Sequence, residues 1–178
     1  GQLTRGGQME LKSTATDGVV LDGQFDTAIY RFDDLNNLEI LLVDGSVDEP
    51  TQAVLLRMFW QPRAGRTPVD ETSNSATIQY FVFADDQVGV YSGGGLLYPF
   101  NDPGETDLRA SFRDGSLRLS DASDRFADRV GVAMASGLLN AQRDDGRTAR
   151  MIDRLRARLR QSLGYPVLVD GDSTLWAH

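Results

Sequence analysis

Short apolar runs separated by turn residues dominate the chain from residue 8 to residue 120. In MELKS, residues 9–13, apolar side chains alternate with charged ones, which is the period of a strand with one buried face. The run QAVLLRMFW, residues 52–60, carries a single charge and is apolar on both faces. A strand of that kind is covered by another layer on each side. The pattern predicts a sheet with at least one such central strand.

Two hairpins are predicted in the middle of the chain. The runs ATIQYFVF and QVGVY flank ADD, so residues 76–91 are expected to form one hairpin. The runs DLRASF and SLRLS flank RDG, which predicts a second hairpin over residues 107–120. The polar stretch from 61 to 76 is the one long connection, and loops of that length in compact domains are usually mobile or functional.

Residues 121–143 fit either a helix or a strand. Phe126, Val130, Met134 and Leu138 recur every four residues, as on a helix, yet residues 130–134 also alternate with small ones. Glycines at two positions within this segment would each weaken a helix by about 1 kcal/mol. We therefore expect a short helical turn near residues 122–128, followed by a strand through residues 131–143.

One amphipathic helix is predicted over residues 148–163. Ile152, Leu155, Leu159 and Leu163 form an apolar stripe at spacings of three and four. Asp145 or Thr148 is expected to cap its start, and Gly164 with Pro166 to end it. A last strand, PVLVDG, is expected to follow.

These elements predict a single, mainly β domain over residues 1–178. Hairpin spacing followed by one amphipathic helix indicates an antiparallel β-sandwich or a strongly curved sheet, with the helix packed on it. Strands and helices do not alternate, which argues against a doubly wound nucleotide-binding fold.

The composition excludes several chemistries. The chain has 178 residues, a formal net charge of −8 and no cysteine, so disulfides, thiolate zinc sites and thiol nucleophiles are absent. Its single histidine is the last residue, His178. Pairs of neighbouring aspartates, at 33–34, 85–86 and 144–145, are expected to form turns. We expect no catalytic residue, no metal site and no cofactor.

The helix carries a row of arginines, Arg150, Arg154 and Arg158. Guanidinium groups bind phosphates well, so this row is a candidate contact for an anionic partner or a membrane surface. The apolar stripe instead indicates a helix docked on a core, whose other face is normally charged. Residues 1–110 hold seven basic and seventeen acidic residues. The negative electrostatic field of this excess of acidic residues would repel a polyanion. We expect no nucleic-acid binding and no membrane span.

A second candidate site lies in YSGGGLLYPFNDPGETD, residues 91–107. Its three glycines would let a backbone approach a ligand closely, and the aromatic and acidic residues could stack on or hydrogen-bond to a sugar. Calcium is another ligand that such clustered oxygens could hold. The simpler interpretation is a glycine-rich bend with aromatic residues at the edge of the core. The candidate ligand-binding residues are Tyr91, Tyr98, Phe100 and Asp102.

The function expected by elimination is non-catalytic binding of a protein, glycan or small ligand. A carboxylate-dependent hydrolase, with aspartates brought together from separate loops, is the alternative, and docking through the arginine row is a third. The chain starts with Gly1, as a mature domain without its signal peptide would, although a trimmed cytoplasmic domain would look the same. We expect a secreted or envelope-attached, lipoprotein-like domain.

Overall fold

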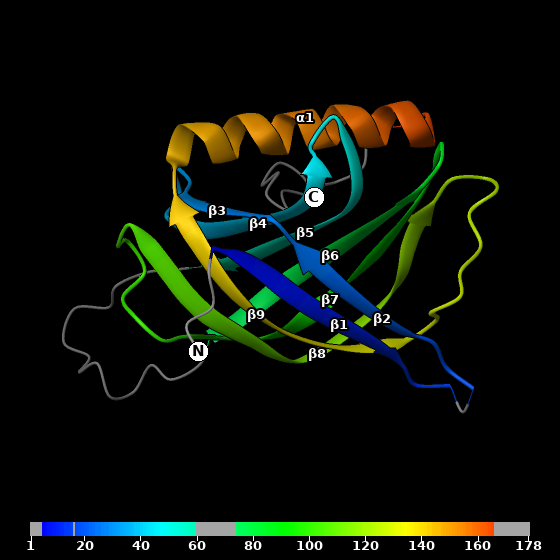
Figure 1. Cartoon of the computed structure of the whole chain (residues 1–178), viewed down its shortest axis with the longest axis horizontal. Helices are drawn as coiled ribbons and strands as arrows, with labels where there is room; N and C mark the ends of the chain where they lie inside the picture. Colours follow the sequence, from blue (N-terminus) through cyan, green and yellow to red (C-terminus); the bar gives the residue numbers. More distant parts are fainter. Residues whose placement is uncertain (1–4, 16, 60–73, 166–178) are drawn as a thin grey trace, which may run out of the picture.

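The computed structural model describes residues 5–15, 17–59 and 74–165. Within them the chain forms nine strands and one helix. Figure 1 shows the helix lying along one side of a strongly coiled sheet. In chain order the elements are β1 (Gly6–Ser13), β2 (Val20–Phe25), β3 (Thr27–Phe32), β4 (Asn37–Ser46), β5 (Glu49–Phe59), β6 (Asn74–Ala84), β7 (Gln87–Pro99), β8 (Asp107–Ala122), β9 (Ala133–Arg143) and α1 (Asp145–Leu163).

The sheet closes into a barrel of seven strands, in the order β9-β3-β4-β5-β6-β7-β8, with β8 pairing again with β9. Strand β9 makes the closure because both of its edges are occupied. Its one edge pairs with β8, and the other pairs first with β1 and then, through two residues, with β3 in parallel. The mainly β prediction is confirmed, whereas a plain sandwich is not: one sheet coils on itself.

The predicted hairpin at residues 107–120 is wrong, because β8 continues through RDG as one strand. The register shifts between Phe112 and Gly115 in its pairing with β9, and Asp114 has a positive φ of 55°. The extra residues form a β-bulge, which bends a strand and increases its twist. A Cβ on Gly115 would lie 2.5 Å from the Phe112 ring, so this bend needs glycine. The other hairpin, β6–β7, is confirmed, with Asp85 at φ 56° in its turn.

Apolar side chains form two cores, one inside the barrel and one between its outer wall and α1. The two cores explain why β4 is buried from Asn37 to Val43 on both faces. The central strand expected at residues 52–60 is confirmed in β5, whose Val54 and Leu56 belong to the inner core and whose Ala53 and Leu55 belong to the outer one. Inside the barrel, the rings of Tyr30, Tyr80 and Tyr91 are at most 1% exposed. Because such large side chains fill the interior, ligand sites must be sought on the outer wall or at the barrel ends.

Helix α1 packs on the outside of the barrel, as the apolar stripe predicts. Ile152, Leu155 and Leu159 are at most 1% exposed, and the helix contacts strands β3, β4 and β7. The helix begins earlier than predicted, and its N-cap is Asp144, whose carboxylate accepts the N–H of Arg147 at 3.0 Å. Neither predicted cap has that role. Its C-cap is Gly164 in the left-handed conformation, as expected, and the predicted last strand falls outside the described residues.

The helical turn predicted at residues 122–128 amounts to one hydrogen-bonded turn, in which the Phe126 N–H donates to the carbonyl oxygen of Ser123 at 3.0 Å. Residues 123–131, which we call the strap, cross from β8 to β9 without helix and lie beside one end of the barrel (Figure 1). Hydrogen bonds to other elements replace helical ones: the Ser123 hydroxyl donates to Gln87 Oε1 at 2.7 Å, and the Tyr91 hydroxyl donates to Asp128 Oδ1 at 2.8 Å. The strand predicted after it is confirmed as β9.

Candidate functional site: a groove on the outer wall

Two adjoining hollows lie on the outer side of the wall made by β8, β9 and β1, and they share Leu138. We call them together the outer groove. The first hollow measures about 980 Å³ and the second about 370 Å³. Their polar and aromatic linings include Phe100, Asn101, Arg109 and Asn140 in the first hollow and Gln8, Glu10, Asp22 and Arg113 in the second.

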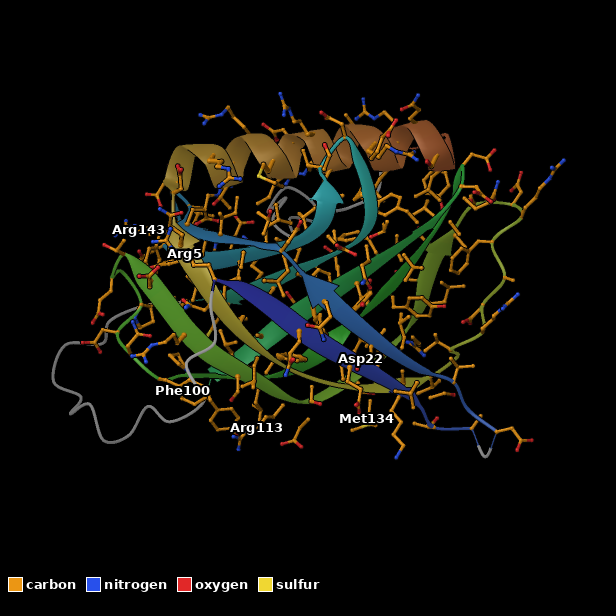
Figure 2. The ribbon with its side chains drawn as sticks, in the orientation of Figure 1. Arg5, Asp22, Phe100, Arg113, Met134 and Arg143 are labelled. Carbon is orange, nitrogen blue, oxygen red and sulfur yellow. The ribbon has the colours of Figure 1, made fainter. Side chains whose placement is uncertain are left out.

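Phe100 stands at one end of the outer groove with 58% of its surface exposed. Its backbone is fixed, because its N–H donates to the carbonyl oxygen of Arg109 at 2.8 Å. Figure 2 shows Phe100 and Arg113 along the same lower edge of the barrel, with Met134 further along that edge. Phe100 therefore presents an exposed aromatic face at a fixed position beside the first hollow.

The loop after Phe100 is held rigid by the side chain of Asn101. Asn101 Nδ2 donates to the carbonyl oxygen of Asp107 at 2.6 Å and to Glu105 Oε2 at 3.1 Å, and Asn101 Oδ1 accepts the N–H of Arg109 at 2.8 Å. Asparagine side chains that hydrogen-bond to nearby backbone groups in this way commonly stabilise loops. Because of these bonds, the polar wall of the first hollow is preformed.

The charges around the outer groove are mixed. Four carboxylates line it, at Glu10, Asp22, Glu105 and Asp107, and two arginines do so as well. Arg5 forms an ion pair with Asp107 at 3.1 Å, and both side chains are about half exposed. The groove therefore offers hydrogen-bond donors and acceptors side by side, without a strong field of one sign.

The structure separates the four predicted ligand-binding residues. Phe100 lines the outer groove, and Tyr98 lies beside it, half-buried with the Arg113 guanidinium 5.2 Å from its ring centroid. Asp102 lies in the adjoining loop and does not line the groove. Tyr91 is buried at a different place, under the strap.

The glycines of YSGGG allow β7 to pack closely against its neighbouring strand in the sheet. Strand β7 carries them against β8, and a Cβ on Gly93 would lie 1.7 Å from the carbonyl oxygen of Ser116. The close backbone approach that the glycine run predicts therefore occurs, but with a neighbouring strand. The glycine run gives no support to a ligand contact at these positions.

Sequence reasoning missed Arg109, Leu138 and Asn140, which complete the first hollow. A signal was present in β9, whose buried residues alternate with outward-facing ones. Met134 and Leu138 point outward there and are 47% and 38% exposed. Apolar residues at the solvent side of a strand indicate a surface with a use, but their location depends on knowing which face is outside.

Two of the three aspartate pairs lie in turns, as expected, whereas the third begins α1. Asp85 lies in the β6–β7 turn, Asp144 caps α1 and Asp145 occupies its first turn. Asp33 closes the β3–β4 turn by accepting the N–H groups of Leu35 and Asn37 at 2.9 and 2.8 Å. Within the described part of the chain, no group of three or more acidic or histidine side chains could hold a metal ion.

We expect Asp33→Ala to lower the free energy of unfolding by about 1–2 kcal/mol at neutral pH. Desolvation acts to raise the pKa of Asp33, but hydrogen bonds from Asn37, Leu35 and Arg57 outweigh it and hold that pKa below its usual 3.8. A lowered folded-state pKa gives stability that is present above the unfolded value and lost as the pH falls through the folded one. The difference between the two proteins in urea unfolding should therefore shrink as the pH falls below 3.8 and through the lowered pKa of folded Asp33. Equal stabilities at pH 7 would contradict this role.

The predicted arginine row lies on a docked helix, and its members already have neighbours. Arg154 is 3.9 Å from Asp48 in an exposed ion pair, and the Arg158 guanidinium lies 5.5 Å from the centroid of the Phe83 ring. Arg158 also donates to the Ser162 hydroxyl. Arg150 is exposed. The exposed Arg154–Asp48 pair contributes little stability, so Arg150 and Arg154 remain accessible from the solvent, whereas Arg158 is half-buried.

Comparison of the chain with protein-family models, with curated proteins and with solved structures finds no match. The helix that the structure describes is not apolar enough to cross a membrane. The function is therefore inferred from the geometry of this chain alone.

Proposed function

We propose that the protein is a non-catalytic domain that binds a neutral glycan in the outer groove. The observation that carries this proposal is the exposed ring of Phe100 at the edge of a hollow whose other walls are largely polar. A sugar ring has a face of C–H groups and a rim of hydroxyls. An aromatic ring beside amide, guanidinium and carboxylate groups complements both, and few such polar groups suffice to orient a ligand.

Rigidity of the site supports the same proposal. The outer groove stands on paired strands, and Asn101 fastens the loop that carries Phe100. A preformed site loses little conformational entropy when it binds, so more of the contact energy remains as affinity. Because the two hollows share Leu138, an oligosaccharide could contact both of them.

The charges of the outer groove favour a neutral ligand. Its acidic and basic side chains nearly balance, since Arg5 pairs with Asp107, while the net charge of −8 on the whole chain disfavours a polyanion such as a nucleic acid or a sulfated glycan. Sugar hydroxyls both donate and accept hydrogen bonds, and they can use either kind of side chain. We place the domain outside the cytoplasm as part of this proposal, because such glycans are exposed there and the cysteine-free chain needs no reducing compartment.

Isothermal titration with a panel of neutral hexasaccharides, such as cellohexaose, chitohexaose and maltohexaose, tests the proposal. We expect at least one to bind, and Phe100→Ala to weaken that binding about tenfold or more, which corresponds to about 1.4 kcal/mol. Phe100→Trp should retain it, because a larger aromatic face still stacks. Thermal unfolding of the Phe100 variants should match the wild type, since the ring is exposed.

Leu35→Ala is the matched control, because Leu35 is equally exposed at 59% but lies in the β3–β4 turn, away from the groove. It should bind the sugar as the wild type does. The absence of binding across the panel, or equal binding by Phe100→Ala, would reject the proposal. Binding of a protein ligand in the groove would show that the site is real and the glycan wrong.

Hydrolysis of the bound glycan is the second candidate function. Glu10 and Asp22 are direct cross-strand partners in β1–β2, and both line the second hollow. Most glycosidases use two carboxyl groups that flank the glycosidic bond to be cleaved. Release of nitrophenol from chromogenic glycosides, abolished by Glu10→Gln, would establish this function, and unchanged oligosaccharide after long incubation would exclude it for the glycan that binds.

A further inference from the structure

A separate cavity of about 510 Å³ opens at the end of the barrel where β6 turns into β7. We call it the mouth pocket. It lies between the start of β2, the end of β6 and the strap, and shares no lining residue with the outer groove. In Figure 1 the strap is the yellow-green chain at the right of the barrel. The volume of the mouth pocket falls within the range of about 300–1,000 Å³ that small-ligand sites occupy.

The walls of the mouth pocket are mainly apolar. Leu21 enters from β2, Val82 from β6, and Phe126 and Val130 from the strap. Val19 forms part of its lip and is 45% exposed, so apolar surface continues to the solvent. Barrel mouths with such walls are common ligand sites, and an apolar chain in this one would cover surface that now faces water.

The strap that closes this pocket is held by polar contacts at a few points. Asp128 Oδ1 accepts the Tyr91 hydroxyl at 2.8 Å and the N–H groups of Val130 and Gly131 at 3.1 and 2.8 Å. The Phe126 ring packs edge-on to Tyr91, with centroids 6.4 Å apart. Burial raises the pKa of Tyr91, as does its hydrogen bond to the Asp128 carboxylate, so the hydroxyl keeps its proton and the contact persists.

The rim of the mouth pocket carries two cationic side chains, although the Asp86 carboxylate lies near enough to Arg125 for the two charges to attract each other. Arg125 and Arg129 line the pocket, and among the described residues neither is in an ion pair. Asp85 is the one acidic residue that lines the pocket within the described part of the chain. Two guanidinium groups above an apolar slot favour a ligand whose anionic head remains at the surface while its chain enters.

We infer that the mouth pocket binds a long-chain carboxylate, with its hydrocarbon chain between Leu21, Val82 and Phe126 and its head beside Arg125 and Arg129. This site is independent of the glycan site. The two arginines supply charge-assisted hydrogen bonds to the carboxylate, and the apolar walls supply most of the affinity. The Tyr91–Asp128 contact keeps the strap in the position that shapes the pocket.

Titration calorimetry with laurate below its micelle concentration tests the inference. We expect one laurate per chain, and affinity at least tenfold lower in Val82→Trp, which fills the slot. Should circular dichroism show that Val82→Trp does not fold, Ala84→Trp at the rim replaces it. Leu35→Trp adds the same ring at a remote exposed site and should leave the affinity unchanged.

Charge-reversal variants and an uncharged ligand test whether the two arginines bind the carboxylate head group. The double variant Arg125→Glu and Arg129→Glu should lose about tenfold in laurate affinity, whereas Arg150→Glu on α1 should not. Dodecanol, which has the same chain without charge, should bind the wild type more weakly and respond little to the arginine changes. Equal binding of laurate and dodecanol, no binding of laurate, or unaltered binding by the slot-filling variants would each overturn the inference.

Phe100→Ala separates this site from the glycan site. It should weaken oligosaccharide binding about tenfold or more and leave laurate affinity unchanged, while the slot-filling variants should weaken laurate binding and leave oligosaccharide affinity unchanged. Loss of laurate binding in Phe100→Ala would overturn the independence of the two sites. Failure of the sugars alone would reject only the glycan proposal.

Discussion

Gly93→Ala is expected to destabilise the protein by about 3 kcal/mol or more, because its methyl group has no space. A Cβ at Gly93 would lie 1.7 Å from the carbonyl oxygen of Ser116 and 3.1 Å from the Leu117 Cα. Both are backbone atoms of β8, so relief requires that β7 and β8 separate. Urea unfolding followed by far-UV circular dichroism measures the loss, and partial loss of strand signal in the absence of urea would agree with it.

The neighbouring Gly94 provides a matched control for this prediction. A Cβ at Gly94 would lie 3.4 Å from the carbonyl oxygen of Ala76, which is an ordinary contact. Gly94→Ala should therefore be neutral, or stabilising by up to about 1 kcal/mol through the less flexible unfolded chain. Equal effects of the two substitutions would show that β7 and β8 do not approach each other as described.

Leu155→Ala is expected to lower the free energy of unfolding by about 2–5 kcal/mol, the range for buried leucines. Leu155 is fully buried between α1 and the barrel wall, in a core that also contains Ile29, Leu41 and Phe81. Truncation removes these contacts and leaves a cavity, since packed strands cannot move in to fill it. Urea unfolding measures the change, and two-state analysis requires that fluorescence and circular dichroism give the same transition.

This prediction also tests whether the arginine-dense segment is scaffold. Leu35→Ala removes the same atoms from a side chain that is 59% exposed, and it should change stability by less than about 0.5 kcal/mol. Arg154→Ala, on the solvent side of α1, should likewise have a small effect. If Leu155→Ala were as harmless as these controls, α1 would be free of the barrel and its apolar stripe would be open to a partner.

Most elements could be predicted from the sequence because their signals are local. Alternation of apolar and polar residues identifies β1, and the run at residues 52–60, apolar on both faces, identifies β5 as a strand covered on both sides. The stripe on α1 predicts both the helix and the face that it buries. Where local signals conflicted, local rules failed: RDG resembles a hairpin turn but forms a bulge, and the periodicity of Phe126 and Val130 resembles a helix but belongs to the strap.

The candidate sites were less predictable, because they join residues that are distant along the chain. Phe100 was identified from its glycine-rich, aromatic segment. Its companions Arg109, Leu138 and Asn140 come from β8 and β9, and they meet it only because those two strands pair. Tyr91 was grouped with Phe100 by sequence proximity, yet β7 carries the two side chains to different sites.

Local patterns in the sequence are enough to predict most of the strands, the leucine face on which the helix docks, and the absence of thiols. Closure of the sheet depends instead on pairing between distant segments, because β9 pairs with β8 at one edge and with β1 and β3 at the other. The same pairing brings outward-facing residues from different strands together in one hollow. Side-chain periodicity is set within a few residues, whereas register and closure are set by contacts between strands that can be more than one hundred residues apart, as β1 and β9 are.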